Sequence, residues 1–143
     1  MDNAASSHPA SKSDVIGRFR IVRTLGHGAQ GAVFLASDPE LGRLVAIKSL
    51  SVGGDGSADR VDGLMREART ASGLSHPNVV PVYEVGLADD VPYVVFEYVE
   101  GVTLGQLIRS EGALTTAKAV IAMSQILAGV AHAHGKGLVH GDI

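Results

Sequence analysis

The chain has 143 residues, and 45% of them are hydrophobic, which suffices for the core of one domain of ordinary size. Its 12 basic and 15 acidic residues leave a net charge of −3, so we expect no nucleic-acid partner and no polybasic membrane anchor. The absence of cysteine excludes disulfides and thiolate metal sites and fits a cytoplasmic protein.

Residues 1–14 are predicted to form a disordered tail. They are mostly small or polar and contain no apolar run, so they have the pattern of neither a secretory signal nor a segment with a core. Further along, no segment reaches the roughly 18 consecutive apolar residues that a membrane-spanning helix needs. We therefore expect no membrane segment in this sequence.

Alternating hydrophobicity predicts three antiparallel strands within residues 17–50. The alternating positions are Phe19, Ile21, Leu25, Val33, Leu35, Val45 and Ile47. After a loop of small residues at 53–56, apolar residues recur at helical spacing from Val61 to Ala71. This spacing predicts one amphipathic helix that ends near Gly73.

Two further β-rich runs, 79–86 and 92–99, follow the turn residues His76-Pro77-Asn78. They are separated by an acidic turn at 88–90 and predict strands four and five.

The last third of the chain is predicted to be helical. Thr103 is suited to cap a short helix, and Thr115 to cap a long one that ends at Gly135 or Gly137. The long helix has an apolar stripe formed by Ala117, Val120, Ile121, Leu127, Ala128 and Ala131. The expected fold class is thus α+β, with a five-stranded antiparallel sheet and one helix followed by further helices.

Residues 25–33 read LGHGAQGAV, which contains the glycine spacing G-x-G-x-x-G. The same spacing opens a helix in dinucleotide-binding folds, but here the following Val33-Phe34-Leu35 run favours a strand. A hairpin is therefore expected. Its glycines would let backbone N–H groups approach a triphosphate without side chains in the way.

Lys48 ends the apolar run Val45-Ala46-Ile47-Lys48. On its own, such a lysine most often reaches water at the edge of a sheet. A buried ammonium instead needs an anionic partner, and Glu67 lies beside the apolar stripe of the predicted helix. The alternative for Glu67 is a solvated helix charge.

Taken in order, these motifs and His140-Gly141-Asp142 near the end of the chain resemble the protein kinase family. The resemblance covers roughly residues 17–143. It implies a kinase N-lobe at 15–98 and the hinge with part of the C-lobe at 99–143. The residues that it assigns to ATP binding are Leu25, Gly26, Gly28, Gly31, Val33, Ala46, Lys48, Phe96, Glu97 and Val99.

Within this set the resemblance implies separate roles. Lys48 would bind the α- and β-phosphates and pair with Glu67. Val33 and Ala46 would form apolar walls against adenine. Phe96 would be the gatekeeper, after which Glu97 and Val99 would meet the adenine through backbone groups.

Asp142 stands where the family has the aspartate that accepts the proton of the substrate hydroxyl, so the resemblance makes Lys48, Glu67 and Asp142 the catalytic set. Gly141 replaces the arginine of the family motif, which puts control by a phosphorylated activation loop in doubt. The family's ligands for Mg²⁺ come later in the sequence, so we expect a truncated domain with no metal ligand here and little activity of its own.

The expected function is that of the ATP-binding portion of a serine/threonine kinase, which transfers the γ-phosphate to protein hydroxyls when complete. Two alternatives stay open. One is an inactive pseudokinase module that binds nucleotide or a partner. The other is a small-molecule phosphotransferase of the aminoglycoside type, which the His-Gly-Asp triplet also resembles. The protein substrate is not predicted.

Overall fold

The computed structural model describes residues 14–28, 31–50 and 58–139, without the side chains of 58–61, 64 and 67. Apart from Asp14, the predicted tail lies outside the described residues, as do Gln30 and the His140-Gly141-Asp142 triplet.

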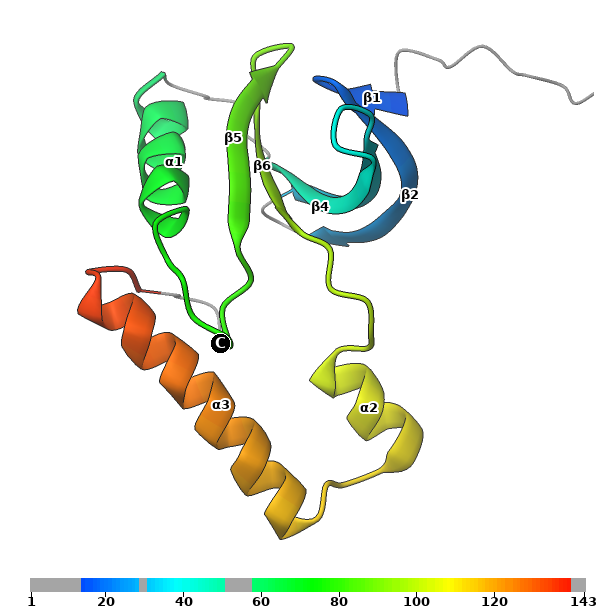
Figure 1. Cartoon of the computed structure of the whole chain (residues 1–143), viewed down its shortest axis with the longest axis vertical. Helices are drawn as coiled ribbons and strands as arrows, with labels where there is room; N and C mark the ends of the chain where they lie inside the picture. Colours follow the sequence, from blue (N-terminus) through cyan, green and yellow to red (C-terminus); the bar gives the residue numbers. More distant parts are fainter. Residues whose placement is uncertain (1–13, 29–30, 51–57, 140–143) are drawn as a thin grey trace, which may run out of the picture.

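The elements follow the order expected from the sequence (Figure 1). The strands are β1 Val15–Ile16, β2 Phe19–Gly28, β3 Gly31–Asp38, β4 Arg43–Leu50, β5 Val82–Ala88 and β6 Val91–Glu97. The helices are α1 Ala58–Ala71, α2 Leu104–Glu111 and α3 Thr116–Gly135. The five predicted strands are confirmed, and the two-residue β1 is an addition that was too short to show a sequence pattern.

One antiparallel sheet contains all six strands in the order β1-β2-β3-β4-β6-β5. It curls around its own axis, with α1 beside β5 and with α2 and α3 below the sheet (Figure 1). The acidic turn between β5 and β6 places Asp89 and Asp90 at positive φ angles of 48° and 63°. Two-residue hairpin turns need this conformation, which aspartate tolerates better than most residues.

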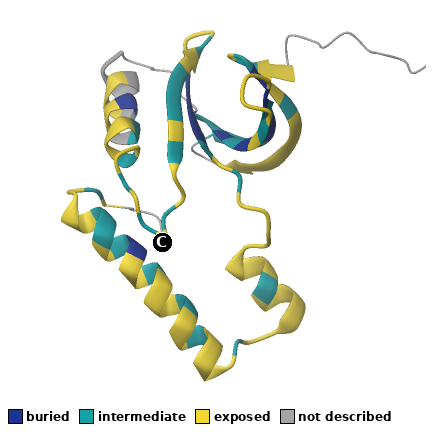
Figure 2. Ribbon diagram, viewed as in Figure 1, coloured by how far each residue is buried: buried dark blue, intermediate teal, exposed yellow. Residues whose placement is uncertain are grey.

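Leu35, Leu50 and Val94 are buried on one face of the sheet, and the main hydrophobic cluster occupies the other. Its buried members are Phe19, Ala36, Val45, Ile47, Tyr93 and Val95. The rings of Phe19 and Tyr93 meet edge to face, with their centroids 6.2 Å apart. Figure 2 shows that the buried positions concentrate in the sheet, whereas α2 and α3 are mostly exposed.

Both predicted threonine caps are present. Thr103 accepts a hydrogen bond from the Gln106 N–H at 3.1 Å, and the Gln106 side chain accepts one from the Thr103 N–H at 2.7 Å. Thr115 accepts from the Lys118 N–H at 3.4 Å. The long helix ends at Gly135, and Gly137 beyond it has a φ of 77°, which favours glycine.

The apolar stripe predicted for α3 does not face the sheet. Its large members Val120, Ile121 and Leu127 are 59–60% exposed. The residues of α3 that face the rest of the chain include Ile126 and the buried Gly129. This helix is apolar on nearly all sides, so its hydrophobic pattern could not indicate which side would be covered. Within the described residues, no helix has both the length and the apolarity to span a membrane.

Candidate functional site

The glycine motif lies in the β2–β3 hairpin, so the hairpin prediction is confirmed and the strand-to-helix alternative is excluded. Gly26 is opposite Val33, and Gly28 is opposite Gly31. Gly31 has a φ of 131°, a conformation that residues with a Cβ rarely adopt. A Cβ added at Gly26 or Gly28 would meet no atom within 4 Å. Packing therefore does not require these two glycines, and the space beside their backbone is open to a ligand.

The strand register assembles the predicted nucleotide residues. Lys48 is paired with Val33 on one side and Val94 on the other, while Ala46 is paired with Leu35 and Phe96. Residues that are opposite in an antiparallel ladder point to the same side of the sheet, as do residues two apart in one strand.

Val33, Ala46, Lys48 and Phe96 therefore share one face of the sheet. The core residues Val45 and Ile47 alternate with Ala46 and Lys48 and point to the opposite face. All four site residues are half-buried, so they line a sheltered surface that keeps some access to solvent. Leu25 and the hairpin glycines lie at the end of the same sheet.

Glu67 lies on α1, which runs beside β5, the neighbour of β6. Its side chain lies outside the described residues. The pairing of Glu67 with Lys48 therefore stays a prediction. The same holds for Asp142, which the structure does not describe.

The end of β6 and the residues after it leave specific backbone groups available. The Glu97 N–H donates to the Pro81 carbonyl oxygen at 3.0 Å, so the Glu97 group that can meet a ligand is its carbonyl. Val99 is exposed, and among the described residues its N–H has no backbone partner. A carbonyl acceptor and an N–H donor two residues apart match the edge of a purine that carries both a donor and an acceptor.

Two cavities lie away from Lys48. One of 680 Å³ and one of 910 Å³ are both lined by parts of the segment 76–81 and by α3. The smaller one also includes Glu97 and Val99. Neither contains Lys48 or the glycines of the hairpin, so strand register rather than cavity size locates the candidate site. In the part of the chain that the structure describes, no cluster of acidic or histidine side chains is suited to a metal ion.

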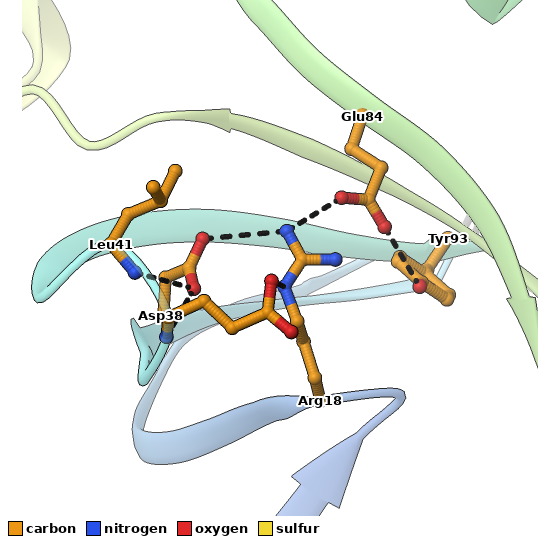
Figure 3. Close-up of polar contacts among 6 residues, drawn as sticks. Arg18, Asp38, Leu41, Glu84 and Tyr93 are labelled. Carbon is orange, nitrogen blue, oxygen red and sulfur yellow. Dashed lines mark hydrogen bonds and ion pairs between the residues drawn. The ribbon is translucent and has the colours of Figure 1, made fainter.

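A cluster of charged side chains that the sequence did not indicate surrounds Arg18 (Figure 3). The Arg18 guanidinium lies 2.7 Å from a Glu84 carboxylate oxygen and 3.4 Å from oxygens of both Asp38 and Glu40. The hydroxyl of Tyr93 donates to Glu84 at 3.3 Å. These residues are far apart in sequence and share no motif, so no signal short of the fold could have grouped them.

The ionisation of this cluster follows from its contacts. Burial of Asp38 would raise the pKa of its carboxyl, but hydrogen bonds from Arg18 and from two backbone N–H groups hold that pKa below its ordinary value. Burial, followed by the nearby Glu84 carboxylate, raises the pKa of Tyr93. Asp38, with 1% of its side chain exposed, is thus kept as a buried carboxylate by Arg18.

A family model described as "Protein kinase domain" matches residues 19–143. Serine/threonine-protein kinase PrkC of Bacillus subtilis (strain 168) is 43% identical over 129 residues, which are 90% of this chain and 20% of that protein. PknJ of Mycobacterium tuberculosis (strain ATCC 25618 / H37Rv), also named a serine/threonine-protein kinase, is 34% identical over 137 residues, covering 96% of this chain and 23% of PknJ.

Among solved structures, the kinase domain of Mycobacterium tuberculosis PknI superposes with a TM-score of 0.78 at 27% identity. The match covers 94% of this chain and 55% of that domain. The chain thus spans about a fifth of the length of the two curated relatives.

Proposed function

Because the chain belongs to the protein kinase family, as the match over residues 19–143 shows, we propose that it is the ATP-binding portion of a serine/threonine kinase. When complete, the protein would transfer the γ-phosphate of ATP to hydroxyl groups of a protein. The family generally uses ATP and Mg²⁺. The observation that carries the proposal for this chain is the register that places Val33, Ala46, Lys48 and Phe96 on one face beside the glycine hairpin.

The residues of this face would each bind a different part of ATP. Lys48 would hold the α- and β-phosphates through its ammonium charge, and the backbone N–H groups of the hairpin would cover them. Val33 and Ala46 would pack against adenine. The Glu97 carbonyl would accept a hydrogen bond from the base, and the Val99 N–H would donate one.

The remaining proposed roles concern residues whose side chains the structure does not describe. Glu67 would keep the ammonium of Lys48 in place, and Asp142 would accept the proton of the substrate hydroxyl. ATP supplies the phosphoryl group, and catalysis by the protein is mainly positioning and charge stabilisation.

The named relatives support protein hydroxyls rather than small molecules as acceptors, since PrkC and PknJ are both named serine/threonine-protein kinases. A cytoplasmic location is consistent with the absence of cysteine.

Nucleotide binding is tested by thermal unfolding with and without Mg-ATP. A ligand at 100 times its dissociation constant stabilises the folded state by about 2.7 kcal/mol, so ATP should raise the melting temperature of the wild type. Lys48→Met keeps the aliphatic stem but removes the charge, and it should abolish most of this rise. Lys118→Met, at an exposed position of α3, is the matched control and should keep it.

An equal rise in Lys48→Met and wild type would contradict binding through this face. The transfer step is tested separately by expressing the extended reading frame with magnesium and labelled ATP. A complete domain that phosphorylates neither itself nor a generic protein substrate would contradict the proposed activity.

A further inference from the structure

The turn between α1 and β5 contacts α3 at two points. The His76 ring stacks on the His132 ring, with centroids 5.1 Å apart and planes inclined by 30°. The carbonyl of Asn78 lies so close to Gly129 that an added Cβ there would be 2.8 Å from the oxygen. Positions 129 and 132 are three residues apart and therefore lie on the same side of the helix. A histidine pair thus sits at one end of a close contact between a turn and a helix.

Acid must change the hydrogen bonding of His76. The Asn78 N–H donates to His76 Nδ1 at 3.0 Å. A ring nitrogen that accepts carries no proton, so the proton of the neutral ring lies on Nε2. In a protonated imidazole both nitrogens are donors. Protonating His76 therefore removes the acceptor and breaks its bond to Asn78.

No described carboxylate is placed to neutralise the pair. Within the described part of the chain, neither His76 nor His132 makes a salt bridge. The other ionisable groups that line the cavities at this turn are Glu97 of β6, in the same cavity as His76, and His134 of α3, in the neighbouring one. Two protonated rings at stacking distance would repel each other.

We propose that His76 and His132 form an acid-sensitive latch that releases the turn at 76–79 from α3 when the rings become protonated. Imidazole is the side chain whose charge changes in mildly acidic solution. A folded state that binds fewer protons than the unfolded chain loses stability as the pH falls. Because the turn connects α1 to β5, its release removes a support of α1.

Melting temperatures of the full chain at about pH 7.5 and about pH 5.5 test the latch. His132→Phe keeps an aromatic ring against His76 but cannot take up a proton. His76→Asn keeps a side-chain acceptor for the N–H two residues on. His134→Gln removes an exposed histidine of the same helix and is the matched control. Wild type and the control should lose at least about 3 °C more on acidification than the other two variants.

Equal losses in all four proteins would overturn the latch. His76→Asn and His132→Phe both preserve the shape of the contact, so failure of both to melt cooperatively at the higher pH would also count against it. If only one of them folds, that variant decides. No nucleotide is present in these measurements, so their outcome is independent of the proposed ATP site.

Discussion

Replacing Gly129 by alanine sets a gain in helix propensity against a steric clash, and we expect the clash to prevail. Alanine is favoured over glycine inside a helix by about 1 kcal/mol. At Gly129, however, the new Cβ would lie 2.8 Å from the Asn78 carbonyl oxygen and 3.4 Å from its carbonyl carbon. The obstacle is backbone rather than a flexible side chain, so the turn has to move away from α3.

Overpacking of a close contact typically costs about 1–3 kcal/mol. After subtraction of the propensity gain, Gly129→Ala should lower the free energy of unfolding by about 1 kcal/mol, and by up to about 2 kcal/mol. Gly63→Ala on α1 is the matched control, because a Cβ there would meet no atom within 4 Å. This second substitution should stabilise the chain by about 0.5–1 kcal/mol.

Urea unfolding followed by far-ultraviolet circular dichroism measures both variants against the wild type. Opposite signs of the change for the two glycines are the expected result. If Gly129→Ala is as stable as the wild type or more stable, the turn does not rest on α3 as the structure describes, and the contact argument is wrong.

Two further predictions use the same unfolding measurement. One concerns the packing of Ile47 in the core, and the other concerns the ionisation of Asp38. Ile47 is fully buried, so Ile47→Ala should cost about 2–5 kcal/mol, whereas Leu127→Ala, at a position 60% exposed, should change stability by no more than about 0.5 kcal/mol. Equal losses of stability in the two variants would contradict the burial of Ile47 in the core. Arg18 and two backbone N–H groups hold the pKa of Asp38 below its ordinary 3.8, so this carboxylate stabilises the fold above about pH 4, and that contribution is lost as the pH falls further. Asp38→Asn should remove this part of the acid dependence, and an unchanged pH profile would contradict the role given to Arg18.

Motif spacing predicts part of the candidate site. The glycines at 26, 28 and 31 and Lys48 could be identified because their residue types and order are tied to a specific chemistry. Once the strands are known, the alternation of side chains along each strand also predicts which residues share a face of the sheet. The pairing of Lys48 with Val94 could not be predicted, because it depends on β6 inserting between β4 and β5.

The Arg18 cluster and the stacked histidines had no sequence signal at all. Each joins residues separated by long stretches of chain, and their types are common on protein surfaces. The sequence indicates only that His76 belongs to a turn, and its contact with His132 on α3 is visible only in the fold.

By itself the sequence determined the local structure and the kind of chemistry. The strands, the threonine-capped helices and the glycine hairpin depend on alternation, capping and backbone freedom, which act over a few residues. Only the tertiary structure decided which faces are covered. The apolar α3 could pack through any side, and it uses Gly129 because only a residue without a side chain lets the Asn78 carbonyl approach so closely.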